Sequence, residues 1–255
     1  MIRFSANLGF LWTDRSLPEG IRAAADAGFH AVECHWPYDT PASAVKEALT
    51  ETGLSMLGIN TNRGNVSQGE NGVAALKGRE LEARQYIDQA IDYALEINCK
   101  NIHVMAGFAD SGEKGAQETF ANNLQYACTS TAHHNKTILI EPLNRFDAPG
   151  YFVSTLEQAL STLESVAMPN LKIMFDCYHL QIMGGDLLRR YQQAAEHVGH
   201  IQFASAPQRA EPDSGEVNYP WLLREFMASG YDGFFGAEYK PSRNTDVSLD
   251  WMSAY

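Results

Sequence analysis

Eight short runs of apolar and β-branched residues recur along this chain of 255 residues, and longer helical patterns separate them. The runs are Arg3 to Leu8, Ala31 to Cys34, Ser55 to Asn60, Asn101 to Ala106, Thr137 to Glu141, Lys172 to Asp176, His200 to Phe203 and Gly233 to Glu238. Between them lie amphipathic stretches such as Arg79 to Ile97 and Thr155 to Val166, with apolar residues at three- and four-residue steps. Gly28, Gly53 and Gly230 precede returns to a strand, as glycines do at helix ends.

This alternation predicts βαβ units that build a parallel sheet. Eight units without a linker, in a chain of the usual barrel length of about 250 residues, predict a single (β/α)₈ TIM barrel over residues 1–255. An open doubly wound sheet is the alternative, because periodicity does not reveal closure. The stretch from Thr61 to Gly78 is long for a connector, so we expect either a substrate loop or lid or an ordinary surface loop.

Charge and composition exclude several classes of protein. A net charge of −12 and a pI near 5.0 disfavour binding to nucleic acid or to an anionic membrane. No apolar run approaches the about 20 residues of a membrane-spanning helix, and the N-terminus lacks a signal-peptide pattern. The cysteines have no CxxC spacing and fit neither a disulfide framework nor a zinc site; they are Cys34, Cys99, Cys128 and Cys177. We expect a cytoplasmic protein with a small-molecule substrate; whether it forms a homo-oligomer stays open.

Four predicted strands carry polar residues at or near their ends, where the active-site face of a barrel lies. These residues are Glu141, Asp176, Gln202 and Glu238. They lie about one βα unit apart, so we expect them on consecutive strands and close together. Each has a structural alternative, such as a helix cap for Asp176 or a buried ion pair for either glutamate. Three facing carboxylates repel one another unless a cation compensates, which favours a divalent ion such as Mg²⁺ or Mn²⁺ over a structural zinc.

A second group of polar residues surrounds these four, and its members are Glu33, His103, His179, Arg209 and Lys240. His179 can reach a substrate oxygen or bind backbone at a helix start. Arg209 can hold a carboxylate with two parallel hydrogen bonds or be merely solvated. Glu33 and His103 can bind substrate hydroxyls or position their neighbours. Four other histidines show no such placement and are expected to be surface or structural residues: His35, His133, His134 and His197.

Several segments together resemble the hydroxypyruvate isomerase family, over nearly the whole chain. They are IEPLNRFDAPGYF, FDCYHLQIMGGD, HIQFASAPQRAEPDSGEVNYPWL and GYDGFFGAEYKP, with AVECHWPY, HVMAG and ALKGRE nearer the N-terminus. That family belongs to the xylose-isomerase-like, metal-dependent barrels. The resemblance implies isomerisation of hydroxypyruvate to tartronate semialdehyde, or a close reaction on 2-oxo-tetronates, in carbohydrate and glyoxylate metabolism.

The resemblance also implies roles for individual residues. Glu141 and Glu238 match the proton donor and acceptor, and with Asp176 and Gln202 they match the metal ligands. In such a mechanism one glutamate removes a proton, the ion stabilises the resulting enediolate, and a glutamate returns the proton to the adjacent carbon.

Two further matches and two departures bear on the substrate. His179 and Arg209 match substrate-contacting positions in related sugar epimerases. Ala210 stands where the family has a histidine, and Asn65 stands where it has an acidic residue.

Three other functions use the same fold. A 3-epimerase of neutral ketoses shares the ion and the glutamate pair, but the motifs near Arg209 favour an acid. An endonuclease-like phosphodiesterase needs several metals, many histidines and a basic groove, which the net charge of −12 disfavours. A ligand-binding barrel without catalysis is disfavoured because both glutamates are present.

Overall fold

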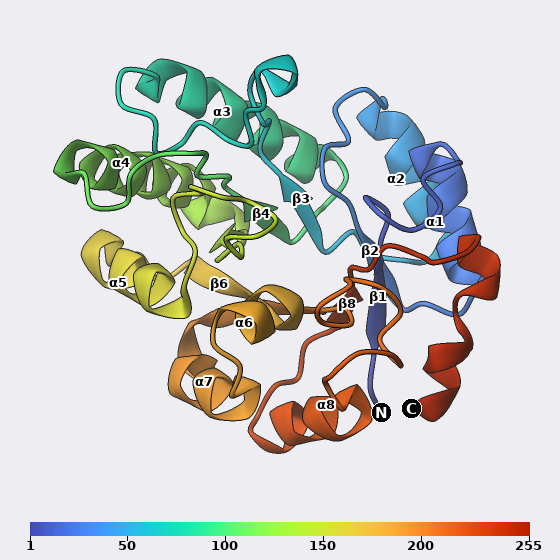
Figure 1. Cartoon of the computed structure of the whole chain (residues 1–255). Coiled ribbons are helices and arrows are strands. Elements are labelled where there is room, and N and C mark those ends of the chain that lie inside the picture. Colours follow the sequence, from blue (N-terminus) through green and yellow to red (C-terminus); the bar gives the residue numbers. More distant parts are fainter.

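Eight parallel strands form one sheet in the computed structural model, which describes residues 1–255 (Figure 1). The strands are β1 (Phe4–Asn7), β2 (Ala31–Glu33), β3 (Gly58–Asn60), β4 (Asn101–His103), β5 (Thr137–Ile140), β6 (Leu171–Asp176), β7 (Val198–Phe203) and β8 (Phe235–Ala237). Their order is β2-β1-β8-β7-β6-β5-β4-β3, and a parallel bridge between Val32 and Met56 joins the two ends. The barrel is therefore confirmed, each strand overlaps its predicted run, and the open doubly wound sheet is wrong.

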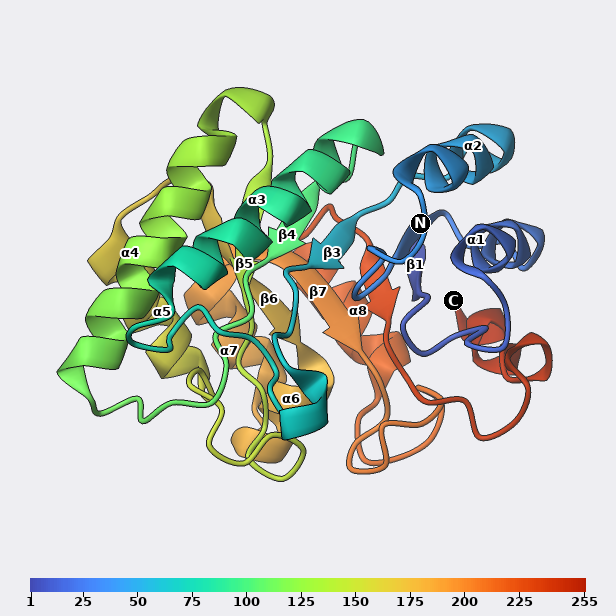
Figure 2. The same cartoon turned by 90° about the horizontal axis from the view of Figure 1, so that it is seen from above.

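An outer ring of helices covers the sheet (Figures 1 and 2). The helices are α1 (Leu17–Asp26), α2 (Ala42–Thr52), α3 (Glu80–Glu96), α4 (Lys114–Thr131), α5 (Leu156–Val166), α6 (Cys177–Met183), α7 (Leu187–Ala194) and α8 (Tyr219–Ala228). Local signals set their ends. Thr155 accepts the backbone N–H of Gln158, whose side chain accepts the N–H of Thr155, and this reciprocal pair begins α5. Gly53 ends α2 in the left-handed region, with φ of 71°.

The apolar core lies within the barrel and between the sheet and the helices. Phe175, Phe203 and Phe226 are completely buried, and Trp251 near the C-terminus packs edge-on against Phe4 and Phe203. All four cysteines are unpaired and buried. None of the helices has the length and apolar character needed to cross a membrane.

The stretch from Thr61 to Gly78 is fixed to the barrel at several points. It contains one turn of 3₁₀ helix, η1 (Val66–Gln68). Gly72 forms an antiparallel bridge with Ala106, which follows β4, and Glu70 pairs with Arg79 at the start of α3. The guanidinium carbon of Arg63 lies 3.7 Å from the centre of the Trp36 ring. This stretch is therefore a structured loop next to the strand ends.

Candidate active site

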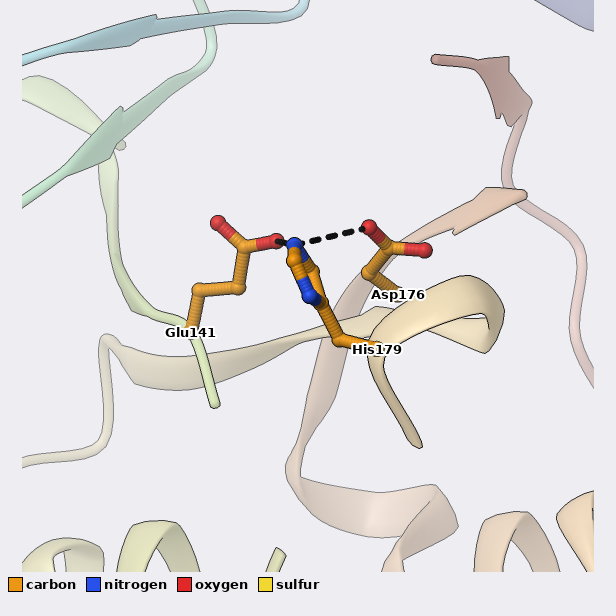
Figure 3. A group of neighbouring side chains, drawn as sticks. All are labelled: Glu141, Asp176 and His179. Carbon is orange, nitrogen blue, oxygen red and sulfur yellow. Dashed lines mark ion pairs between the residues drawn. The ribbon is translucent and has the colours of Figure 1, made fainter. Parts of the chain in front are cut away.

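Two carboxylates and a histidine converge where β5 and β6 end (Figure 3). Glu141 directly follows β5, Asp176 ends β6, and His179 lies in the first turn of α6. The Nε2 atom of His179 is 3.9 Å from Oε1 of Glu141 and 3.6 Å from Oδ2 of Asp176. One potential ligand atom of each residue lies within 4.8 Å of the others, and all three side chains are buried. These distances allow a metal ion to lie here, with the two carboxylates as its ligands.

Asp176 uses its two oxygens differently. Oδ1 accepts the backbone N–H of Tyr178 at 2.8 Å and caps α6. Oδ2 is buried without a hydrogen-bond partner. Burial raises the pKa of this carboxyl to about 7, although the positive charge of Arg209 acts to lower it. The helix cap expected as a structural alternative is present, and it leaves one oxygen of Asp176 for another partner.

His179 is held as a neutral hydrogen-bond donor. Its Nδ1 accepts the backbone N–H of Asn144 at 3.1 Å, and the Asn144 side-chain Nδ2 lies 2.8 Å from the same atom. A backbone N–H can only donate, so Nδ1 carries no proton and the neutral ring has its proton on Nε2. Burial, together with the charge of Arg209, lowers the pKa of His179 well below its usual range. The Nε2–H group therefore faces the carboxylates as a donor, which makes His179 a poor metal ligand.

Glu238, just after β8, is surrounded by donors. Its Oε1 accepts the side-chain amide of Asn7 at 2.9 Å and lies 2.7 Å from Nε2 of His35, and its Oε2 accepts Nη2 of Arg209 at 2.7 Å. Burial by itself raises the pKa of Glu238, but Arg209 and the hydrogen bond from His35 outweigh it and lower the pKa to about 2. Glu238 is thus held as a carboxylate.

Glu141 has the opposite environment. Its Oε1 is buried without a partner, and Oε2 lies 3.6 Å from Nδ1 of His103. Burial and the charges of Glu238 and Asp176 raise the pKa of Glu141 well above its usual range. Burial also lowers the pKa of His103 to about 4, so this ring is neutral near pH 7. The two glutamates therefore form an asymmetric pair.

Arg209 brings a positive charge into the cluster. Besides its bond to Glu238, its Nη2 lies 3.6 Å from Oδ2 of Asp176. The guanidinium packs between the rings of Phe10 and Tyr178, 4.8 and 4.9 Å from their centres. Its Nε is buried and has no hydrogen-bond partner. The Nη2 group of Arg209 is thus paired within the protein, and its Nε–H is free to donate to another acceptor.

Gln202 on β7 lies beside Asp176 in the parallel register of β6 and β7. Its Nε2 donates to Oε2 of Glu33 at 2.7 Å, and its Oε1 is buried without a partner. Glu33, on β2, is 3% exposed, and its oxygens already accept hydrogen bonds from Ser5 and Gln202. The structure therefore does not support the predicted contact between Glu33 and the substrate. Lys240 is exposed, with its Nζ 5.9 Å from the Phe10 ring and outside the carboxylate cluster.

Sequence reasoning missed two residues of the site. His35, expected as a surface or structural residue, is 2.7 Å from Glu238, and Asn7 donates to the same carboxylate. Asn7 ends β1, and His35 directly follows the predicted strand from Ala31 to Cys34, so the rule that selected the other strand-end residues would have found both. The departing positions lie outside the cluster: Asn65 is exposed and accepts from Ser67, and Ala210 donates its N–H to a serine of its own loop.

Buried polar atoms without partners are concentrated in this site. Seven of the eleven such atoms in the structure belong to predicted site residues: His103, Glu141, Asp176, His179, Gln202 and Arg209. Because buried polar groups are nearly always hydrogen-bonded, these atoms are available to a bound ion, a substrate or water. Three of the atoms are oxygens of predicted ligands, and oxygen donors suit a hard divalent cation.

Comparisons with known proteins identify the family of the chain. The family model described as xylose isomerase-like TIM barrel matches residues 21–255. The 2-oxo-tetronate isomerase of Cupriavidus necator is 40% identical over 257 residues, covering 100% of this chain and 99% of the relative. The hydroxypyruvate isomerase of Escherichia coli is 38% identical, with full coverage of both chains. A crystal structure titled AP endonuclease, family 2, from Brucella melitensis superposes with a TM-score of 0.97 at 39% identity, over 100% of this chain and 99% of that one.

Proposed function

The chain belongs to the xylose isomerase-like TIM barrel family and is an isomerase, and we propose that it interconverts hydroxypyruvate and tartronate semialdehyde through an enediolate. Its relatives named hydroxypyruvate isomerase and 2-oxo-tetronate isomerase have similar identities of 38% and 40%. The 2-oxo-tetronate reaction is therefore the second candidate. Both substrates are 2-oxo acids with a hydroxyl on the next carbon, so one site can serve either reaction.

The observation that carries this proposal is the pair of buried glutamates beside a cluster of unpartnered oxygens. Moving a carbonyl to the adjacent carbon requires a proton to leave one carbon and to arrive at its neighbour, while the hydroxyl proton passes to the former carbonyl oxygen. We propose that Glu141 and Glu238, from β5 and β8, carry out the two transfers as general base and general acid. Asn7, His35 and Arg209 fix Glu238, and the unpartnered Oε1 of Glu141 is free to meet the substrate or an ion.

We further propose that the site holds Mg²⁺ or Mn²⁺, with oxygens of Glu141, Asp176, Gln202 and Glu238 as ligands. The residues fit such an ion, because three of the four present a buried oxygen without a partner. When bound, a divalent ion supplies the positive charge that stabilises an enediolate. His179 is not included among the ligands, since its Nε2 carries the proton.

The remaining residues of the site suit a small acid. Arg209 retains an unpartnered Nε, and the rings of Phe10 and Tyr178 hold its plane in place, so we propose that it binds the substrate carboxylate. The Nε2–H of His179 is suited to donate to a substrate oxygen, and His103 offers two unpartnered ring nitrogens. A neutral ketose has no carboxylate for Arg209, which favours the acid over the 3-epimerase alternative.

Net charge separates this proposal from a nuclease function, although one similar structure has an AP endonuclease title. Nucleic acid binding depends on lysine and arginine contacts to phosphates. This chain has 31 acidic against 19 basic residues, and its site is dominated by carboxylates. We therefore expect neither nucleic acid nor a membrane surface as a partner.

Proton NMR in D₂O tests the proposal. The protein with Mg²⁺ is expected to exchange the C3 protons of hydroxypyruvate for deuterium and to produce tartronate semialdehyde, and to lose both activities after chelation. Parallel samples contain 2-oxo-tetronate and a neutral ketose. Turnover of the ketose alone would overturn the assignment of substrate class. Full activity after chelation, with absence of metal verified by elemental analysis, would overturn the metal site.

A further inference from the structure

The side-chain amide of Gln202 has two ends with different surroundings. Its Nε2 donates to Glu33 at 2.7 Å, whereas its Oε1 is buried without a partner. Gln202 is the register partner of Asp176, and it shares a small interior cavity with Asn7 and His103. Asn7 bonds to Glu238, and His103 lies beside the carboxylate of Glu141. The amide therefore contacts Glu33 through its nitrogen, and its cavity neighbours Asn7 and His103 each lie beside a glutamate of the carboxylate cluster.

Glu33 is itself fixed by three side chains from two other strands, β1 and β7. Ser5 on β1 donates to its Oε1 at 2.8 Å, His200 on β7 lies 3.1 Å from the same oxygen, and Gln202 donates to Oε2. Gly236 on β8 leaves the room for this contact. A Cβ atom at Gly236 would lie 2.2 Å from Oε1 of Glu33 and 3.0 Å from Cγ of Gln202. The Glu33 carboxylate is therefore held firmly in the barrel interior.

We propose that Glu33 is a positioning residue that orients the amide of Gln202 so that its oxygen faces the metal ion; this inference rests on the proposed metal site. A carboxylate has only acceptors, so only the NH₂ end of the amide can face Glu33. The oxygen is then directed to the other side. Without this constraint the amide is free to turn, and an NH₂ group cannot coordinate a cation. Partners of this kind typically change metal affinity by about 10–100-fold when they are removed.

Mn²⁺ binding, measured as free Mn²⁺ by electron paramagnetic resonance, tests the orientation without relying on turnover. The Glu33→Gln variant is expected to bind Mn²⁺ about 10–100-fold more weakly than the wild type. The double variant Glu33→Gln with Gln202→Glu exchanges the two groups, because an amide at 33 donates to a carboxylate at 202. This double variant is expected to recover affinity to within about threefold of the wild type, since the second carboxylate oxygen then faces the ion.

Ser5→Ala is the matched control, because it removes one bond to Glu33 and keeps the bond between Glu33 and Gln202. It is expected to keep most of the affinity, and circular dichroism with thermal unfolding checks that each variant folds. Absence of Mn²⁺ binding in the wild type would overturn the proposed metal site itself. Unchanged binding by Glu33→Gln would overturn only the positioning role. A folded double variant that binds Mn²⁺ weakly would also overturn the positioning role, because restoring the amide–carboxylate pair would then not restore the affinity. If Glu33→Gln does not fold, the double variant decides alone.

Discussion

Replacing the two glutamates of the catalytic pair by glutamine, one at a time, is expected to affect the stability of the metal-free protein differently: only Glu238→Gln is expected to destabilise it. In Glu238→Gln, one of the two oxygens becomes an NH₂ group, which cannot accept a hydrogen bond. Whichever position it takes, it faces a donor: Arg209 at one oxygen, or Asn7 and His35 at the other. Loss of a buried hydrogen bond to a charged group costs about 1.5–3 kcal/mol. A chain of this size loses about 2–4 °C in Tm per kcal/mol, so we expect a fall of about 3–12 °C.

Glu141→Gln changes a carboxylate whose Oε1 has no donor to lose. The substitution removes an ionisable group whose charged form is disfavoured by burial and by the charges of Glu238 and Asp176. At pH 8 the metal-free Glu141→Gln variant is therefore expected to be at least as stable as the wild type. Both variants are expected to lose turnover by about 10² or more, as typical for general acid–base groups. Large turnover losses in both variants would then accompany a fall in Tm for Glu238→Gln and an unchanged or higher Tm for Glu141→Gln.

Thermal unfolding of the two metal-free variants at pH 8, combined with turnover after addition of Mg²⁺, measures both effects. Deuterium exchange into the substrate separates the two proton transfers, because a variant that exchanges but makes no product has lost only the return step. Shifts in Tm of the same sign and size would refute the asymmetry of the pair. Near-normal turnover in both variants would show that another group moves the proton, and His179 would be the next candidate.

Three further predictions concern substrate and ion. Arg209→Ala is expected to raise KM for the acid far more than for a neutral ketose, because only the acid has a carboxylate for the guanidinium. Steady-state kinetics measures both values, and Arg63→Ala is the matched arginine control. Equal increases in KM for the two substrates would exclude the carboxylate contact. Asp176 has a pKa of about 7 in the folded protein and of about 3.9 in the unfolded chain, so protonation of this carboxyl favours the metal-free folded state. That stabilisation is lost as the pH rises from about 3.9 to about 7, where the carboxylate needed by an ion forms. The increase in Tm on adding Mg²⁺ is therefore expected to be larger at pH 8 than at pH 5, and a pH-independent increase would contradict this. Finally, kcat/KM values for hydroxypyruvate and 2-oxo-tetronate are expected to lie within about 10–200-fold of each other, and a ratio above about 10⁴ would contradict a shared site.

The sequence predicted the barrel well because strand and helix periods are local signals. The strand ends that position Glu141, Asp176 and Gln202 follow from that alternation alone. Contacts across the barrel do not. Glu238 meets residues 231 and 203 positions away, at Asn7 and His35. Such pairs are fixed by closure of the sheet and by the direction of each side chain, neither of which a residue pattern encodes.

Asp176 shows a second limit of sequence reasoning, because a residue pattern does not reveal that one side chain can have a structural and a functional role at once. In the structure its Oδ1 caps α6 and its Oδ2 remains unpartnered. Gln202 divides its polar atoms in the same way between Glu33 and the cluster. In both residues the hydrogen bond of one polar atom fixes the side chain and thereby sets the direction of the unpartnered oxygen. A side chain with two polar atoms can serve the fold and the site together.

The departures from the family pattern bear on the choice between the two candidate acids. Hydroxypyruvate and 2-oxo-tetronate share the carboxylate and the reacting carbons, and they differ by one hydroxymethyl group. Glu141, Glu238 and Arg209 would contact only the shared atoms, so these residues cannot distinguish the substrates. Discrimination must therefore come from the loops around the cluster, where Asn65 and Ala210 lie. Neither side chain forms a hydrogen bond with Glu141, Asp176 or Glu238, so both departures leave the proton-transfer groups with their geometry, and we expect any effect of theirs to fall on the choice of substrate.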